Sequence, residues 1–274
     1  MLKLDQIYLR GLLTKVGREA LMSRFEHTHA RHKADGSLVT EADLESQRLI
    51  RAALESKWPD SAFLGEEMTA EEQAGALADS SQPLWVLDPL DGTTNYASGM
   101  PFFCISLALL EQGRTRLGMV YDPVRDECFW AEAGQGAWLN DCRLRLEQDF
   151  PVAMDDCLAL VDYKRLDSKL AYALVTSPPF RSQRSLGSVA LEWCWLAAGR
   201  CTLYLHGGQR LWDFAAGCLI HQEAGGALWQ EGCSLLELRQ QQAIGAGNSH
   251  LLAVWKDYLD AVTESPVRLA SRVK

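Results

Sequence analysis

The sequence has little positive charge and no long run of lysine or arginine. Its 274 residues hold 27 Lys and Arg against 36 Asp and Glu, which gives a formal net charge of −9. Proteins that bind nucleic acid need clustered Lys and Arg to replace the counterions of the phosphate backbone. The shortage argues against a general nucleic-acid binder. We expect neither nucleic acid nor a transcription factor as a main partner.

Paired cysteine motifs and a complete zinc site are also missing. None of the eight cysteines forms a Cys-x-x-Cys pair, and several stand in apolar stretches. We therefore expect buried, reduced thiols in a cytoplasmic protein rather than disulfides. His27, His29 and His32 could hold zinc, but a solvated loop is the better interpretation because no cysteine completes a site.

No segment is apolar for long enough to cross a bilayer. The longest apolar run, around residues 102–110, is far shorter than the roughly 20 residues that a membrane helix needs. Residues 1–6 lack the apolar core of a signal peptide, so we expect no membrane attachment. No internal repeat is visible. The acidic, small-residue segment 70–83 is expected to be a mobile loop.

Residues 85–95 are the most informative segment that is present, and they read Trp-Val-Leu-Asp-Pro-Leu-Asp-Gly-Thr-Thr-Asn. The apolar start predicts the end of a buried strand. The rest predicts a tight turn that carries Asp88 and Asp91. Two carboxylates at this spacing can hold a hard cation. Pro89 has no N–H, which leaves carbonyls such as that of Leu90 free to act as ligands.

Gly92 and Thr93 complete this segment. Gly92 lets the backbone come close to a bound anion, and Thr93 adds a hydroxyl beside the carboxylates. A metal site, an anion contact and a hydroxyl together indicate metal-assisted chemistry on a phosphate ester. The alternative is an ordinary turn, because Asp-Pro and Asp-Gly pairs are common turn residues.

Three other acidic residues can be read in two ways. Glu66 follows a short predicted strand and could reach the same metal if the two strands are neighbours, although adjacent glutamates are usually a solvated pair. Asp213 stands where a helix begins and could cap it, and the small residues 215–217 would let that helix pack closely. Asp43 lies three residues after Thr40, a spacing that predicts a capping box.

The order of the predicted elements suggests two halves, residues 1–145 and 146–274, joined by a crossover at 140–152. The first half is expected to be α+β and more antiparallel, and the second to be α/β, because strand and helix alternate there. The elements that we predict are helices at 4–26, 40–57, 167–174, 188–198 and 213–224, and strands at 62–64, 85–87, 103–110, 116–121, 128–133, 137–139, 158–161 and 202–205.

These motifs together make the sequence resemble the inositol monophosphatase family, within the fructose-bisphosphatase-like superfamily of magnesium-dependent, lithium-sensitive phosphatases. The likeness covers nearly the whole chain, in the order and at the approximate spacings of the family. The fold that it implies is a five-layered α-β-α-β-α sandwich. The matching segments are residues 38–43, 65–67, 85–95, 212–217, 223–226 and 247–248.

The resemblance implies two to three Mg²⁺ ions, with Li⁺ as an inhibitor. Asp88 would be shared between the first two ions, and Asp43 would lie near a third, weaker position. The implied ligands of the first two ions are Glu66, Asp88, the carbonyl of Leu90, Asp91 and Asp213. The implied assembly is a homodimer.

The resemblance also implies roles in catalysis and substrate binding. Thr93 and Glu66 would orient and activate a water held by the metal, with Asp91 as the third catalytic residue. Gly92 and Thr93 would offer backbone N–H groups to the phosphate. Lys33 is near the place of a basic residue in the family, but its spacing differs by one. The implied substrate-binding residues are Gly92, Thr93, Gly187, Ser188, His206 and Asp213.

The substrate implied by the resemblance is a small phosphorylated metabolite, most simply a sugar-alcohol monophosphate such as inositol 1-phosphate. Thr94 favours this branch, because bisphosphate nucleotidases and histidinol phosphatases usually have a lysine there. His206 stands where inositol phosphatases commonly have a glutamate, which leads us to hypothesise a changed or broader substrate range. Gly187 and Ser188 could contact substrate hydroxyls or only cap a helix.

Three alternatives remain open. The first two are hydrolysis of 3′-phosphoadenosine 5′-phosphate and of histidinol phosphate. The third is a regulatory scaffold that binds transcription factors, as some relatives do.

Overall fold

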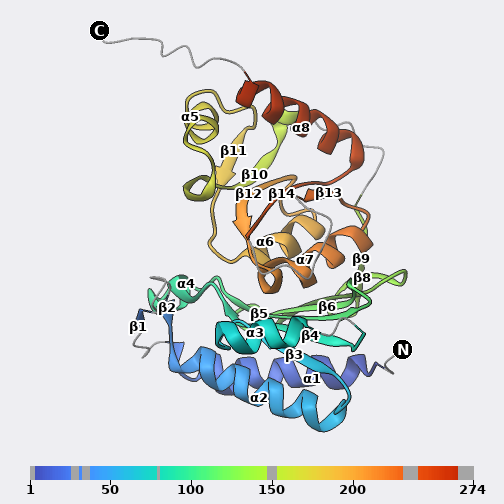
Figure 1. Cartoon of the computed structure of the whole chain (residues 1–274). Coiled ribbons are helices and arrows are strands. Elements are labelled where there is room, and N and C mark those ends of the chain that lie inside the picture. Colours follow the sequence, from blue (N-terminus) through green and yellow to red (C-terminus); the bar gives the residue numbers. More distant parts are fainter. Residues whose placement is uncertain are drawn as a thin grey trace.

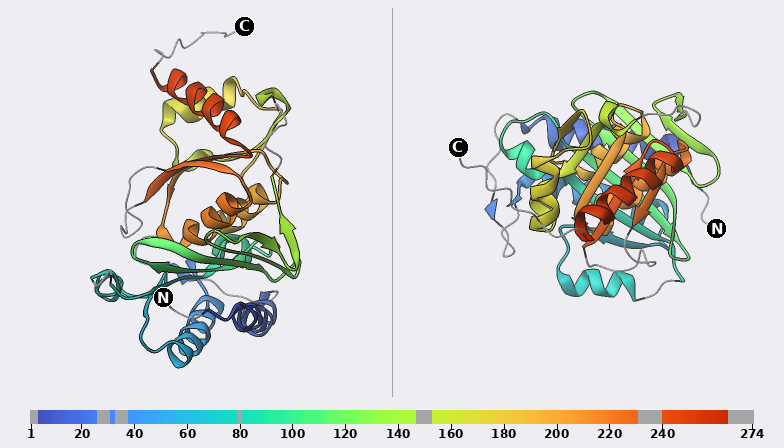
Figure 2. Two further views of the ribbon diagram at one scale, coloured as in Figure 1. Left: turned by 90° about the vertical axis from the view of Figure 1, so that its right-hand side faces the viewer. Right: turned by 90° about the horizontal axis from the view of Figure 1, so that it is seen from above.

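Five layers are stacked in the computed structural model, which describes residues 4–25, 31–32, 38–78, 81–146, 153–230 and 240–264. From bottom to top in Figure 1 they are helices α1 and α2, a seven-stranded sheet, helices α6 and α7, a five-stranded sheet, and helices α5 and α8. The left view of Figure 2 shows the same layers from the side. The predicted α-β-α-β-α sandwich is therefore confirmed. The helices are α1 (Gln6–Val16), α2 (Glu41–Lys57), α3 (Ala70–Leu77), α4 (Thr93–Ala97), α5 (Ser168–Thr176), α6 (Val189–Ala197), α7 (Leu211–Glu223) and α8 (Ser249–Glu264).

The seven-stranded sheet keeps its strands in chain order. Its first pair is parallel and all later pairs are antiparallel, in agreement with the α+β character expected of the first half. Its strands are β3 (Ala62–Gly65), β4 (Leu84–Asp91), β5 (Cys104–Glu111), β6 (Arg114–Asp122), β7 (Glu127–Glu132), β8 (Gly136–Leu139) and β9 (Cys142–Leu144).

The five-stranded sheet has the order β11-β10-β12-β14-β13 and is mixed. Strand β10 pairs in parallel with both of its neighbours, whereas β14 pairs antiparallel with β12 and β13. Its strands are β10 (Leu158–Asp162), β11 (Ser182–Arg184), β12 (Leu203–Gln209), β13 (Ala227–Gln230) and β14 (Gln241–Ala246). A short antiparallel hairpin of β1 (Arg31–His32) and β2 (Leu38–Val39) stands apart from both sheets.

Helices α6 and α7 from the second half pack on the sheet of the first half, so both halves contribute to one core. The division into two domains at residue 145 stays a prediction. Lys33, His27 and His29 lie outside the described residues, as does the side chain of His32. No helix in the described part of the chain is long and apolar enough to cross a membrane.

Strand β4 is buried along its whole length, and its side chains alternate between two cores. Trp85 and Leu87 pack in the core beside α1 and α2, whereas Val86 faces the core beside α6 and α7. This period of two places Asp88 on the face of α6 and α7. The tight turn expected at residues 88–92 is wrong: the strand continues to Asp91 through an irregularity in register, because its pairing with β5 resumes there.

Helix α7 lies unusually close to the larger sheet, as its small residues predicted. A Cβ atom on Gly118 of β6 would lie 2.6 Å from the carbonyl oxygen of Ala216 and 2.8 Å from its Cα. A Cβ atom on Gly217 would lie 2.5 Å from the Cβ of Trp193 in α6. The helix begins at Leu211, two residues earlier than expected. Asp213 is therefore inside the first turn, and the N-cap position predicted for it is wrong.

Residues 70–83 include a helix, so the expectation of a mobile loop throughout this segment is wrong. Thr69 caps α3, and the carboxylate of Glu72 accepts a hydrogen bond of 2.8 Å from the Thr69 N–H. The reciprocal bond runs from the Glu72 N–H to the Thr69 hydroxyl at 3.3 Å. This capping box satisfies the exposed backbone donors at the start of the helix, so the acidic residues help to form it.

Candidate active site

A cavity of about 550 Å³ opens between the two sheets, at the end of β4 and the start of α7. It collects most of the residues that the sequence singled out. The predicted site residues that line it are Glu66, Asp88, Leu90, Asp91, Gly92, Thr93, Gly187, His206 and Asp213. Asp43 and Ser188 are not among the residues that line it, because both side chains are fully buried behind the wall.

Strand pairing explains why the acidic side chains meet. The parallel register of β3 and β4 pairs Gly65 with Leu87, and the Glu66 N–H donates to the Leu87 carbonyl at 3.1 Å. Glu66 therefore leaves the sheet next to Asp88. Two strand ends that are far apart in the sequence thus supply neighbouring carboxylates.

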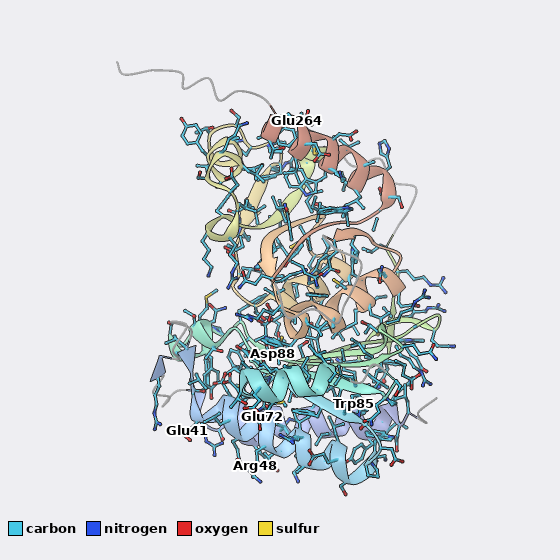
Figure 3. The ribbon with its side chains drawn as sticks, in the orientation of Figure 1. Glu41, Arg48, Glu72, Trp85, Asp88 and Glu264 are labelled. Carbon is cyan, nitrogen blue, oxygen red and sulfur yellow. The ribbon has the colours of Figure 1, made fainter. Side chains whose placement is uncertain are left out.

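Asp213 reaches the same place through an anchor on β5. Ser106 is the cross-strand partner of Asp88, and its hydroxyl donates to the Trp212 carbonyl at 3.1 Å. This bond fixes the first turn of α7 beside β4. Figure 3 labels Asp88 at the boundary between the larger sheet and the helices above it. The Asp213 carboxylate also accepts a bond of 2.8 Å from the Arg210 N–H, which keeps it at the start of the helix.

Three of these carboxyl groups have raised pKa values. Burial and the charges of Glu66, Asp91 and Asp213 raise the pKa of Asp88 well above its ordinary range. Burial, with the charges of Asp91 and Glu66, raises the pKa of Asp213 to about 8. Burial, opposed in part by its hydrogen bonds, raises the pKa of Asp91 to about 6. Like charges in a dry site cannot all ionise cheaply, so this wall of the cavity has an excess of negative charge.

Hydrogen bonds from buried donors, on the side away from the cavity, fix the Asp91 carboxylate. Its Oδ2 atom accepts 2.8 Å and 2.7 Å bonds from the Ser188 hydroxyl and the Ala190 N–H. Ser188 is fully buried, so its hydroxyl faces Asp91 and not the cavity. The neighbouring Gly187 does line the cavity, with a φ of 80° that favours glycine. In this geometry Ser188 orients a carboxylate.

Asp43 is also buried on the side away from the cavity, where it contacts Thr93 of the cavity wall. It accepts bonds from both the N–H and the hydroxyl of Thr40, so the predicted capping box is confirmed. Its other oxygen accepts the Thr93 hydroxyl at 3.2 Å, and that hydroxyl also lies 3.0 Å from the Leu90 carbonyl. Burial, with a smaller effect of the charge of Glu66, raises the pKa of Asp43 to about 6. Asp43 thus orients the hydroxyl that reaches the cavity.

The opposite wall holds a cluster that the sequence did not reveal. Strands β10 and β12 run in parallel with Asp162 paired to His206. Asp162 Oδ2 lies 3.3 Å from His206 Nε2 and 3.1 Å from a guanidinium nitrogen of Arg165. His206 Nδ1 accepts the Gly208 N–H at 3.2 Å, so the ring proton is on Nε2 and is donated to Asp162.

The pKa of Asp162 shifts in the opposite direction from the pKa values of Asp88, Asp91 and Asp213. Burial would raise the pKa of Asp162, but the hydrogen bond from His206 and the charges of Lys164 and Arg165 lower it below its usual range. Burial lowers the pKa of His206, which leaves the ring neutral at pH 7. Asp162 ends a buried strand, as Asp88 nearly does, but its partner strand could not be identified from the sequence.

Glu192 is a second residue that the sequence analysis missed. It stands on the apolar helix α6 and is buried, yet it lines the cavity. Its Oε1 atom accepts the N–H groups of Leu186 and Gly187 at 2.7 Å and 3.1 Å. Burial raises its pKa to about 8, so the carboxyl is largely protonated at neutral pH. Its position as an acidic residue within an otherwise apolar helix is the feature of the sequence that could have identified it.

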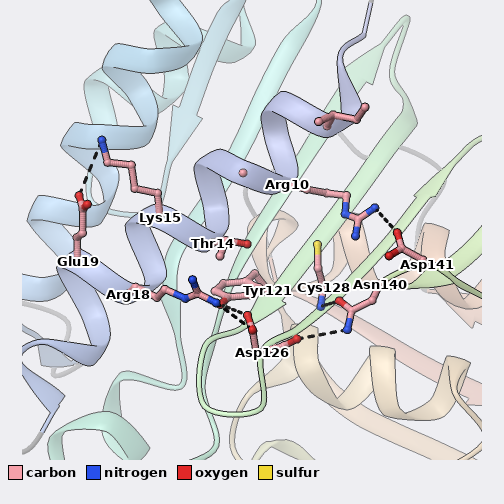
Figure 4. A pocket seen from close by; sticks show the side chains of 12 residues that line it. Arg10, Thr14, Lys15, Arg18, Glu19, Tyr121, Asp126, Cys128, Asn140 and Asp141 are labelled. Atoms are coloured by element: carbon pink, nitrogen blue, oxygen red, sulfur yellow. Dashed lines mark hydrogen bonds and ion pairs between the residues drawn. The ribbon is translucent and has the colours of Figure 1, made fainter.

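A larger hollow of about 820 Å³ lies beside α1, away from these residues. Figure 4 shows its charged side chains in pairs, namely Arg10 with Asp141, Arg18 with Asp126, and Lys15 with Glu19. Because each cation there has an acidic partner, the hollow has no unbalanced charge to attract a ligand. The smaller acidic cavity is therefore the candidate site.

The donor set of the acidic cavity fits a hard divalent cation. Its carboxylates and the Leu90 carbonyl supply oxygen ligands only, which Mg²⁺ and Ca²⁺ prefer. In the described part of the chain, no three acidic, imidazole or thiol groups already converge as a closed metal site. Burial and neighbouring negative charges raise the pKa values of Asp88 and Asp213, and a bound cation would offset both effects.

Comparisons with known proteins agree with this geometry. The model of the inositol monophosphatase family matches residues 6–264. "Nus factor SuhB" of Pasteurella multocida is 38% identical over 198 residues, which cover 71% of this chain and 72% of that protein. "Inositol monophosphatase 1" of Solanum lycopersicum is 35% identical over 245 residues, 85% of this chain and 86% of that protein. The structure of an IMPase of Thermotoga maritima has a TM-score of 0.80 at 29% identity, covering 95% of this chain and 98% of that one.

Proposed function

Because the chain belongs to the inositol monophosphatase family, a family of phosphatases, we propose that it is a Mg²⁺-dependent phosphomonoesterase. The proposed substrate is a sugar-alcohol monophosphate of the inositol-phosphate type, and Li⁺ is the expected inhibitor. One observation carries the proposal. Asp88, Asp91 and Asp213 line the same wall of the cavity, and neighbouring carboxylates, Glu66 included, help to raise the pKa values of all three.

The residues divide into those that would hold the metal and those that would hold the phosphate. Bound Mg²⁺ would supply a Lewis acid for the phosphoryl group and lower the pKa of the attacking water. Its proposed ligands are Glu66, Asp88, the Leu90 carbonyl, Asp91 and Asp213, with Asp43 near a weaker third position.

Thr93 and Gly92 would act on the substrate side. The Thr93 hydroxyl donates to Asp43 or to the Leu90 carbonyl, so its oxygen can accept a hydrogen bond from the attacking water. Glu66 lines the cavity nearby and is the proposed proton acceptor. The first N–H groups of α4, which follow Gly92, have no acceptor within the helix and can bind phosphate oxygens.

Phosphate release from a panel of esters tests the proposal. The panel is myo-inositol 1-phosphate, glycerol 2-phosphate, fructose 1,6-bisphosphate, histidinol phosphate and 3′-phosphoadenosine 5′-phosphate, each with and without Mg²⁺ and with added Li⁺. We expect Mg²⁺-dependent, Li⁺-sensitive release. If histidinol phosphate or the adenosine bisphosphate is strongly preferred, the substrate assignment is wrong. No release from any ester would contradict the enzymatic function.

A second candidate function comes from the name "Nus factor" given to the relative in Pasteurella multocida. A scaffold that binds transcription factors would not need the buried carboxylates, so we favour it less. A pull-down that captures no transcription protein would remove it. We further propose a homodimer, as the resemblance implies, and a cytoplasmic location, which suits the buried free thiols.

A further inference from the structure

Three cationic side chains line the cavity, and two of them, Lys164 and Arg165, lie beside Asp162 on the wall opposite the end of β4. Lys164 and Arg165 follow the end of β10, and Arg210 precedes α7. The Arg165 side chain is 40% exposed, so its guanidinium can reach a ligand. Arg and Lys bind carboxylates and phosphates through charge-assisted hydrogen bonds.

The charges on this wall do not cancel. Asp162 is the carboxylate that lies beside Lys164 and Arg165, and it already accepts bonds from His206 and Arg165. His206 is neutral and adds no charge. Neither Lys164 nor Arg210 has an ion-pair partner among the residues that the structure describes. Lys164 and Arg165 against Asp162 leave this wall with a net positive charge.

The two walls therefore favour ligands of opposite sign. The carboxylates at the end of β4 favour cations, whereas Lys164 and Arg165 at the end of β10 favour an anion. Lys164 and Arg165 are exposed to solvent, and a substrate with only neutral hydroxyls beyond its phosphate would make no charge-assisted bond with either of them. A substrate with a second anionic group would satisfy them.

We propose that the substrate has a second anionic group, a carboxylate or a second phosphate, remote from the ester that is hydrolysed, and that Arg165 and Lys164 select it. This inference rests on the proposed phosphatase function, and it replaces the neutral sugar alcohol of the proposed substrate with an alcohol that carries an anionic group. Arg165 is the main determinant because Asp162 orients its guanidinium at 3.1 Å.

Two matched pairs of esters test the selection and distinguish its source. Glycerol 2-phosphate and 2-phosphoglycerate differ by one carboxylate, and fructose 1-phosphate and fructose 1,6-bisphosphate differ by one phosphate. We expect kcat/KM to be at least about tenfold higher for the anionic member of one or both pairs. The pair with the larger ratio identifies the carboxylate or the phosphate as the group recognised.

Equilibrium binding tests the same selection without turnover. The phosphonates 3-phosphonopropionate and 3-hydroxypropylphosphonate cannot be hydrolysed, and they differ by a carboxylate against a hydroxymethyl group. With the intact enzyme in Mg²⁺, calorimetry should give about tenfold tighter binding of the carboxylate if that is the group recognised. Fructose 1,6-bisphosphate and fructose 1-phosphate, titrated in EDTA to prevent turnover, provide the phosphate arm.

Three variants locate the effect. Arg165→Gln should bring the ratio within each pair close to one, and Lys164→Gln, which removes no described ion pair, should reduce it in part. Lys256→Gln makes the same change in net charge on α8, where Lys256 pairs with Asp260 far from the cavity, and should leave the ratio unchanged.

Each outcome separates the two proposals. Ratios near one in the unmodified enzyme, or ratios that survive both cavity variants, would overturn the selection while leaving the phosphatase intact. Selective binding of the anionic ligands without release of phosphate from any ester would support the cationic wall and contradict the phosphatase function.

Discussion

The two walls of the candidate active site are built in opposite ways. At the end of β4, Glu66, Asp88 and Asp91 meet Asp213 with like charges side by side, and burial raises the pKa values of the three aspartates. Across the cavity, Asp162 is matched by Arg165 and by the Nε2–H of His206, and its pKa is lowered. One cluster needs a partner from outside the chain, whereas the carboxylate of the other is satisfied within it.

The contrast between the two walls distinguishes residues that serve chemistry at a cost to stability from residues that also stabilise the fold. Unbalanced buried carboxylates oppose folding, so they are expected where a function requires them. An acidic group with hydrogen-bonded cationic partners stabilises the native state. Removing a carboxylate from each wall should therefore have opposite effects on stability.

The largest effect is expected from Asp88→Asn, because the charges of three neighbouring carboxylates act on Asp88. We expect kcat/KM to fall on the order of 10³-fold or more, since the charge proposed to hold Mg²⁺ is lost. Phosphate release at saturating Mg²⁺ measures it. Asp60→Asn, at an exposed position, is the matched control. An unchanged rate in Asp88→Asn would contradict the metal assignment.

The second effect is a dependence of metal-free stability on pH. The pKa of Asp213 rises from 3.8 to about 8, so between pH 6.5 and 8 the native state holds a proton that the unfolded state has lost. Stability due to this group is complete below pH 3.8 and is lost as pH rises through 8. Its contribution should fall by up to about 2 kcal/mol from pH 6.5 to 8. Urea unfolding in EDTA measures this decrease.

Two variants and added metal sharpen that measurement. Asp213→Asn should remove its part of the slope, and Mg²⁺ should reduce the slope in the unmodified protein. Glu192, whose pKa is also about 8, should add a similar slope that Glu192→Gln removes. His221, with a pKa lowered to about 4 by burial, opposes this slope slightly near pH 6.5, because the unfolded state still binds part of a proton there, and it contributes almost nothing above about pH 7.5. If the free energy of unfolding without metal rises from pH 6.5 to 8, the acidic wall does not have the excess of negative charge that we infer.

The third effect tests the other wall. Asp162→Asn leaves Arg165 without its carboxylate and replaces the charged acceptor of His206 with a neutral one. We expect the free energy of unfolding to fall by about 1–2 kcal/mol at pH 7, because a partly buried, charge-assisted pair is lost. Urea unfolding in EDTA allows comparison with Asp213→Asn, which should be more stable than the unmodified protein. Changes of the same sign would invalidate the contrast between the walls.

The smallest effect concerns the group behind Asp91. Ser188→Ala removes the 2.8 Å bond to Asp91 Oδ2 and leaves the 2.7 Å bond from the Ala190 N–H. Loss of about 1 kcal/mol predicts a roughly fivefold higher half-saturating Mg²⁺ concentration, with KM for the substrate unchanged. Ser185→Ala, on the same loop and at the cavity surface, is the control. A higher KM with an unchanged Mg²⁺ requirement would instead favour the substrate contact predicted from the sequence.

The acidic wall could be predicted because its residues stand in recognisable contexts. Asp88 follows a continuous apolar run, Glu66 follows another strand, and the small residues after Asp213 indicated close helix packing. Asp162 was missed because its role depends on β10 lying beside β12, and the pairing of strands 40 residues apart cannot be deduced from local pattern. Long-range register, rather than residue type, was the missing information.

Two helices that were not predicted, α3 and α8, have recognisable local patterns in the sequence. The spacing from Thr69 to Glu72 is that of a capping box and would have identified α3. The interval of four between Leu251, Trp255 and Leu259 is that of an amphipathic helix and would have identified α8. The boundary of α7 could not be read from side chains, because Arg210 is not among the residues that usually cap helices.

The close contact between Gly118 and Ala216 has a consequence for exchanging parts between relatives. It sets how near α7 lies to the sheet, and α7 presents Asp213 to the carboxylates of β4. A chimera that joins the first half of one phosphatase to the second half of another can keep every acidic residue and still misplace Asp213. Compatibility between parents is then decided by a backbone-to-backbone fit at positions 118 and 216, where no catalytic residue stands.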